Sequence, residues 1–234
     1  MGLAALFACD GPNASLNCPD VNSNQSGSFM ARTSGFPLSV QLDSTFTEDQ
    51  KQAAFQAVQA WNEFGHSLIG SDIFVLNQVE ISPSVRVLDP HDCSQNFGAA
   101  GELMLLRESR QEHWIAIGLS AQIPGATMRC SSNGAVTEQM TIVNTAIADP
   151  STLSAIFAHE LGHSLGLDHS CNGSSSTSTT TYISCMALDS NDSYREAVMY
   201  PWVSAQSTPV TTGVLLQDND KVRGACMIRS TDSG

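Results

Sequence analysis

Basic residues are scarce in this sequence. Lysine and arginine together number 10 against 23 aspartate and glutamate residues, so the formal net charge is −13. An acidic surface repels the phosphates of nucleic acids and of anionic lipids, and no local cluster of basic residues offsets this charge. We therefore expect neither nucleic acid nor an anionic membrane surface as a partner.

Long apolar runs are also missing. No stretch of the sequence reaches the roughly 20 apolar residues that a membrane-spanning helix needs, so none is predicted. The sequence shows no internal repeats. The 234 residues suit one sizeable domain with a core of its own.

The seven cysteines include no Cys-x-x-Cys pair, which argues against a cysteine zinc site and a thioredoxin-type redox site. Scattered cysteines are typical of disulfides in an extracytoplasmic, oxidising compartment. The stretch Met1–Cys9 resembles a bacterial lipoprotein signal, which makes Cys9 the candidate for lipidation. The alternative is a frayed apolar terminus.

Residues 1–35 are predicted to be a signal-like N-terminus followed by a flexible arm, which is Asn-, Ser- and Gly-rich at 10–35; the folded domain is predicted at 36–234. Helices are predicted at 47–65, from Asp149-Pro150 onward, and at 215–228. The first begins with capping-box spacing between Thr47 and Gln50 and ends at Gly65. Apolar patterning predicts strands at 36–43, 72–81, 101–108, 113–120, 126–130 and 138–147. This order of elements predicts a single α+β domain.

The stretch AHELGHSLGLDHS, at 158–170, holds three of the six histidines. On the helix predicted there, Leu153, Phe157 and Leu161 form an apolar stripe. His159 and His163 lie one turn apart on another face, about 200° around the axis from that stripe. Two imidazoles placed in this way can bind one zinc ion.

Gly166 explains how a third ligand joins the pair. A continued helix would carry His169 roughly 240° away from His163, whereas glycine can end the helix and turn the chain. His159, His163 and His169 would leave the fourth zinc position for water, which is typical of catalytic zinc sites. Glu160 could then act as general base without being a ligand.

The pattern H-E-x-x-H-x-x-G-x-x-H resembles the metzincin signature, and Ser170 after the third histidine resembles the matrixin branch. The stretch AVMYP at 197–201 is similar to a Met-turn, with Met199 beneath the metal and Tyr200-Pro201 lining the pocket; Met186 is the alternative methionine. The resemblance covers about residues 36–230. It implies a zincin-like fold with a twisted mixed β-sheet of about five strands and three main helices.

The resemblance implies a zinc-dependent metalloendopeptidase that acts on polypeptides as a monomer, secreted or anchored at the surface by a lipid. One catalytic Zn²⁺ is expected, whereas the sequence does not support structural Ca²⁺. Two alternatives stay open: a non-catalytic surface binding module of the same fold, and a zinc hydrolase of a non-peptide amide.

Six cysteines besides Cys9 can form three disulfides in fifteen ways. Cys171 and Cys185 flank a Ser/Thr-rich loop and are predicted to pair, which would hold the chain that follows His169. The remaining pairs would be Cys93–Cys130 and Cys18–Cys226. Cys18 also stands in NCPDV at 17–21, which is similar to the matrixin cysteine switch; a structural disulfide is the alternative that we favour.

Overall fold

The structure is a computed structural model that describes residues 31–32, 35–81, 101–132, 135–148, 151–173, 184–201 and 214–229. Most of the predicted N-terminal arm lies outside these residues. So do three cysteines: Cys9, Cys18 and Cys93. The described elements are, in chain order, β1 (Ala31–Arg32), β2 (Leu38–Asp43), α1 (Glu48–Ile69), β3 (Phe74–Ile81), β4 (Glu102–Arg107), α2 (Gln111–Ala116), β5 (Gly125–Ser132), β6 (Ala135–Val143), α3 (Leu153–Ser164), a 3-10 helix (Cys185–Ala187), α4 (Ser193–Glu196) and α5 (Asp218–Arg229).

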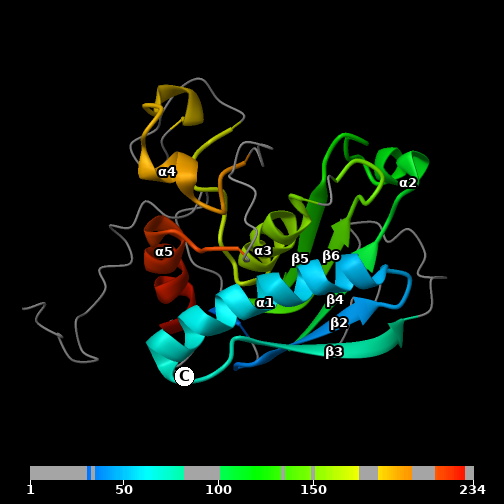
Figure 1. Cartoon of the computed structure of the whole chain (residues 1–234), viewed down its shortest axis with the longest axis horizontal. Helices are drawn as coiled ribbons and strands as arrows, with labels where there is room; N and C mark the ends of the chain where they lie inside the picture. Colours follow the sequence, from blue (N-terminus) through cyan, green and yellow to red (C-terminus); the bar gives the residue numbers. More distant parts are fainter. Residues whose placement is uncertain are drawn as a thin grey trace, which may run out of the picture.

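The strands form one mixed sheet in the order β1-β6-β4-β2-β3, with β5 also paired to β6. All pairs are parallel except β5 and β6, which are antiparallel. Within the described residues β5 pairs with β6 alone, so its other side is an edge of the sheet. The mixed α/β architecture confirms the zincin-like fold class, and the two-residue β1 is an addition to the five longer strands (Figure 1).

The first helix begins where the capping box predicted. The Thr47 hydroxyl accepts from the backbone N–H of Gln50, and the Gln50 side chain accepts from the backbone N–H of Thr47 at 3.0 Å. These two bonds satisfy amide groups that have no partner inside the helix.

The predicted end of this helix at Gly65 is wrong. Helix α1 continues to Ile69 and is capped by Gly70, whose φ of 74° is the left-handed conformation that glycine tolerates. Gly65 instead serves packing, because a Cβ there would lie 2.6 Å from the Ile73 side chain.

The strand predicted at 113–120 is also wrong, because the structure has helix α2 there. Trp114 and Ile117, three residues apart, are both buried, whereas Ile115 between them is 66% exposed. That spacing fits one face of a helical turn rather than the alternation of a strand. The indole N–H of Trp114 also donates to the Glu108 carbonyl oxygen at 3.1 Å.

Two apolar cores lie on opposite faces of the sheet. Val143 of β6 belongs to the core that includes α1 and α3, whereas Met140 and Ile142 belong to the core that contains Trp114 of α2. This follows from the alternation of side chains along a strand. Helix α1 runs across the sheet in Figure 1, and α4 and α5 lie to the left of α3 in this view.

Helix α3, which carries the histidine motif, packs its apolar stripe into the first core. Leu153, Phe157 and Leu161 are buried, as predicted. The helix begins at Leu153 with Thr152 as N-cap; the predicted cap at Asp149-Pro150 lies outside the described residues. Trp61 of α1 fastens the two helices together, since its indole N–H donates to the carbonyl oxygen of Ala158 at 2.9 Å.

None of the described helices is long and apolar enough to cross a membrane.

Candidate metal centre and active site

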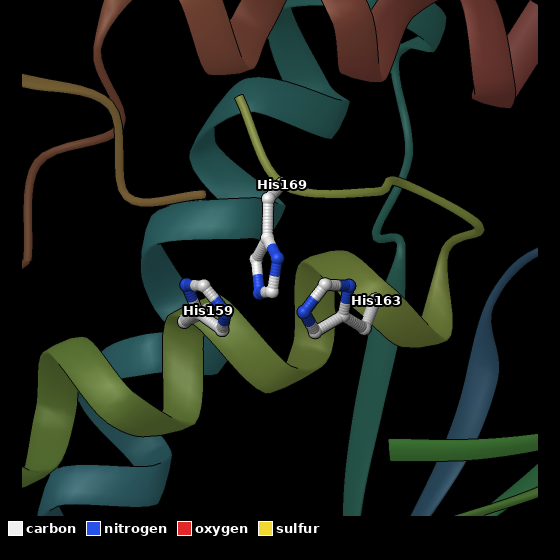
Figure 2. Close-up of side chains that lie close together, drawn as sticks. All are labelled: His159, His163 and His169. Atoms are coloured by element: carbon white, nitrogen blue, oxygen red, sulfur yellow. The ribbon is translucent and has the colours of Figure 1, made fainter. Parts of the chain in front are cut away.

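Three imidazoles converge above helix α3 (Figure 2). His159 and His163 lie one turn apart on the helix, with ring centroids 4.7 Å apart. The ring of His169 lies 5.2 Å from that of His159 and 4.9 Å from that of His163. One ligand atom from each of the three lies within 4.8 Å of the others, so the cluster can hold a metal ion.

The turn that returns His169 to the helix is built on Gly166. Its φ is 103°, a backbone conformation that residues with a Cβ rarely adopt. Its N–H donates to the His163 carbonyl oxygen at 2.9 Å, and the N–H of Leu167 donates to that of Gly162 at 3.1 Å. These two bonds form a Schellman motif, which ends α3 and redirects the chain toward the metal centre.

Backbone carbonyls fix two of the imidazoles. The Nδ1 of His159 lies 2.7 Å from the Val198 carbonyl oxygen, and the Nδ1 of His163 lies 2.7 Å from that of Leu167. A carbonyl oxygen only accepts, so each Nδ1 carries the hydrogen and each Nε2 keeps its lone pair for a metal.

Electrostatics keep the three imidazoles neutral. Burial, and to a smaller extent the neighbouring His169, lowers the pKa of His159 to about 4. Burial also places the pKa of His163 well below its ordinary value and lowers that of His169. Neutral imidazoles are the form that binds a metal. The donor set therefore fits zinc, for which three histidines are a known catalytic ligand set.

Glu160 lies next to His159 on α3 and is buried. Burial raises the pKa of its carboxyl group to about 7, although a hydrogen bond from Thr127 acts in the opposite direction. The Thr127 hydroxyl donates to Glu160 Oε2 at 2.7 Å. A carboxyl group that titrates near neutral pH can accept and release a proton under physiological conditions.

A cleft of about 550 Å³ opens over these groups. The edge strand β5 supplies one wall through Gly125, Ala126, Thr127 and Arg129. Glu160 and the three histidines line the same cleft, together with Gln122, Ile123, Pro124, Ile156, Asp168 and Pro201. The three imidazoles that could hold a metal ion and the Glu160 carboxyl group therefore face one shared space.

The segment 197–201 lies against α3. Met199 is fully buried, and a Cβ on Gly162 would collide with its sulfur atom. Pro201 lines the cleft, whereas Tyr200 accepts a hydrogen bond from Arg195 at 3.2 Å. Met186, the alternative methionine, is 71% exposed and so cannot form a buried floor.

Two residues of α5 that the sequence analysis did not single out support the site. The Asp220 carboxylate accepts from the backbone N–H groups of Val198 at 2.8 Å and Met199 at 3.1 Å. Arg223 donates to the carbonyl oxygen of Asp168 at 2.8 Å and to that of His169 at 3.1 Å.

Both charged side chains are buried. Asp220 and Arg223 share a helix face with buried Met227, because the intervals are three and four residues. Charged residues on an otherwise apolar helix face could have indicated, from the sequence, that Asp220 and Arg223 have a structural role.

The predicted disulfide between Cys171 and Cys185 is present. Cys130 and Cys226 are also disulfide-bonded. Their predicted partners, Cys93 and Cys18, lie outside the described residues, so these two pairings stay predictions. Disulfides favour an extracytoplasmic location.

Comparison with known proteins agrees with this geometry. The model of metallo-peptidase family M12 matches residues 38–210, which is more than half of the chain and includes the whole histidine motif. No curated protein matches the chain. On the strength of the family match, and with three histidines arranged to bind a metal, the chain belongs to metallo-peptidase family M12.

Proposed function

We propose that the protein is a zinc-dependent endopeptidase of matrixin-like type in which Glu160 is the general base. One observation carries the proposal: the buried carboxyl group of Glu160 shares a cleft with three imidazoles that can hold one metal ion. The M12 family match supports peptide bonds as the substrate class.

His159, His163 and His169 would hold the zinc ion, the first two through their Nε2 atoms. Bound there, zinc supplies a Lewis acid that activates water and polarises the carbonyl group of the substrate. The carbonyl oxygens of Val198 and Leu167 keep two of the rings in the orientation that this requires.

Glu160 moves the protons. As carboxylate it accepts a proton from the water that attacks the carbonyl carbon, and it then passes that proton to the leaving amine. Since Glu160 is adjacent to His159 on the helix and faces the same cleft, it can do so without occupying a metal position.

The edge strand β5 supports an extended peptide as substrate. Its backbone is paired on one side only in the described part of the chain, and its residues line the cleft. An extended segment can add to such an edge through main-chain hydrogen bonds, which do not depend on its side chains. A substrate held in this way passes across the metal centre, as endopeptidase activity requires.

The matrixin-like assignment rests on Ser170 and Tyr200-Pro201. Ser170 ties the third-ligand segment to the following one, because its N–H donates to the Met199 carbonyl oxygen at 2.7 Å and its hydroxyl donates to that of Tyr194 at 2.6 Å. Pro201 lies in the cleft wall. We further propose that the protein acts as a secreted or surface-anchored monomer with Cys9 as the lipidated residue, supported by the apolar stretch before Cys9.

The test compares the wild-type protein with Glu160→Gln. The substitution keeps the shape of the side chain but removes proton acceptance, so peptide hydrolysis should fall by roughly 10²–10⁴ while bound zinc stays near one per chain. Cleavage-site profiling on a proteome digest and elemental analysis measure the two quantities. Glu112→Gln, on the exposed surface of α2, is the matched control and should behave as wild type.

Two results would reject the proposal. An active Glu160→Gln variant would show that Glu160 is not the general base. Full zinc content in a His163→Ala, His169→Ala double variant would show that these histidines do not bind the metal. A wild-type protein that holds zinc but cleaves no peptide would instead support a binding module of the same fold.

A further inference from the structure

Helix α3 and the edge strand β5 meet at Glu160 and Thr127. The Thr127 hydroxyl oxygen lies 2.7 Å from Glu160 Oε2 and 3.1 Å from the backbone carbonyl oxygen of Glu160. A second hydroxyl, that of Thr141, lies 2.7 Å from the same Thr127 oxygen. Glu160 is therefore linked to both β5 and β6 of the sheet.

Strand register brings the two threonines together. Thr127 and Thr141 are directly opposite each other in the antiparallel pair of β5 and β6. Their neighbours Met128, Met140 and Ile142 point to the opposite core, so both hydroxyls lie on the face that α3 covers. Thr141 is completely buried there, where an unpaired hydroxyl would be costly.

Gly125 shapes the other side of the carboxyl group. A Cβ on Gly125 would lie 2.6 Å from Glu160 Oε1. Gly125 and Thr127 are two residues apart and so face the same way from β5. On β5, Thr127 therefore supplies a hydroxyl donor to Oε2, and Gly125, which has no side chain, leaves room for Oε1.

Counting hydrogens fixes the direction of these bonds. A carboxylate only accepts, and a threonine hydroxyl has one hydrogen and two lone pairs. For Glu160 as carboxylate, Thr127 must therefore donate to Oε2, and Thr141 can donate to Thr127. The chain of donation runs from Thr141 through Thr127 to Glu160.

We propose that Thr127, oriented by Thr141, is a positioning residue that holds the Glu160 carboxylate in its reactive orientation, with Gly125 leaving the space for it. This inference rests on the proposed role of Glu160 as general base. Without the Thr127 hydroxyl, Oε2 loses the donor that fixes it and the carboxylate is free to rotate about its terminal bonds. A displacement of about 1 Å at a reacting group can cost about 10² in rate.

The experiment uses the zinc-loaded protein and compares Thr127→Val, Thr127→Ser and Thr141→Val. We expect kcat to fall roughly 10- to 100-fold in Thr127→Val, with KM and zinc content unchanged. Thr127→Ser should return kcat to within a few-fold of wild type, because it restores the hydroxyl. Thr141→Val should show a smaller loss, because Thr127 can still donate to Glu160.

Thr137→Val is the matched control, since Thr137 also lies on β6 but its hydroxyl donates to the Cys130 carbonyl oxygen. It should keep the wild-type kcat. Crystal structures of the Thr127 variants provide a readout that does not depend on activity. In Thr127→Val the Glu160 carboxylate should move away from residue 127 of β5. In Thr127→Ser it should again lie within hydrogen-bond distance of the hydroxyl at residue 127.

Wild-type kcat in Thr127→Val, with Glu160→Gln inactive, would overturn this inference and leave the proposed function intact. An active Glu160→Gln variant would overturn both. If Thr127→Ser did not restore kcat, the Thr127 hydroxyl would not be the group that positions Glu160. Wild-type kcat in Thr141→Val would overturn the role of Thr141. If Thr127→Val does not fold, Thr127→Ala is judged by the same criteria.

Discussion

At the scale of single residues, burial shifts the titration of the active-site groups in opposite directions. It lowers the pKa values of the three histidines and raises that of Glu160. The cause is the same in both cases, because removal from water disfavours the charged form of any group. The site thus favours neutral ligands and a carboxyl group that changes protonation near neutral pH.

This burial makes a prediction for the metal-free protein. The pKa of Glu160 rises from 4.5 to about 7 on folding, so the folded state binds the proton more tightly than the unfolded state. Stability therefore falls as the pH rises from about 4.5 to about 7 and stays low above it. At 1.36 kcal/mol per pH unit, the cost above pH 7 is about 3 kcal/mol.

Glu160→Gln removes this cost, because the amide is neutral at every pH. Urea unfolding of the metal-free proteins should show the variant to be the more stable one at pH 8, with little difference at pH 4. The comparison within each pH cancels the contribution of the histidines, which is present in both proteins. A gap of equal size at the two pH values would contradict the prediction.

At the scale of the element, α3 contains a glycine that serves packing rather than flexibility. Gly162 lies between the two helical histidines, and a Cβ there would collide with the buried sulfur of Met199 and lie 3.1 Å from Trp61. In an exposed helix, replacing glycine by alanine stabilises by about 1 kcal/mol. Here the clash should reverse that sign.

We predict that Gly162→Ala destabilises the protein by about 1–3 kcal/mol, the usual cost of overpacking a core. Met199→Ala alone should cost about 2–5 kcal/mol through the lost side chain. In the double variant the clash is absent, so the two losses should not add. Thermal or urea unfolding of all four proteins measures the coupling, and simple additivity would show that the two residues do not compete for space.

At the scale of the whole molecule, the segment around His169 is attached to distant parts of the chain by hydrogen bonds and by a disulfide. Arg223 of α5 binds the carbonyl oxygens of Asp168 and His169, and the disulfide of Cys171 fixes the chain just after them. Cys171 and Cys185 are buried in a small core with Leu188. The position of His169 thus depends on contacts with distant parts of the chain.

Removal of the disulfide should lower stability more than it changes the chemistry. The bridge spans a sequence separation of 14 residues, and the chain-entropy model assigns a loop of that length about 3 kcal/mol. The double variant Cys171→Ala, Cys185→Ala avoids burying a new polar group and should unfold at a lower urea concentration. Its kcat under conditions where it is fully folded should stay close to that of wild type; a large fall in kcat with unchanged stability would assign the bridge to the site instead.

Short-range features could be predicted from the sequence because helix geometry fixes them. The spacing of His159 and His163 and the stripe through Phe157 depend only on 3.6 residues per turn. The capping box at Thr47 and the positive φ at Gly166 are likewise local matters of backbone chemistry. These features already indicated a metal centre and an active-site helix.

Patterns alone failed where packing decides between local alternatives. The residues around Trp114 alternate well enough for a strand, but burial of Trp114 and Ile117 on one side favours a helix. Glycine is a common residue at a helix end, yet α1 continues past Gly65 to Ile69, and a Cβ at Gly65 would lie 2.6 Å from the Ile73 side chain. A short stretch of sequence does not include the distant residues whose packing decides between a helix and a strand, or where a helix ends.

The sequence by itself determined the candidate metal ligands, the neighbouring carboxylate and the turn at Gly166, since all lie in the short stretch from His159 to His169. Only the tertiary structure decided what holds Glu160 and the ligands in place. Thr127 reaches Glu160 across 33 residues of chain, and Asp220 reaches Met199 across 21. Such contacts depend on strand register and helix packing, which bring distant segments together and which local spacing does not specify.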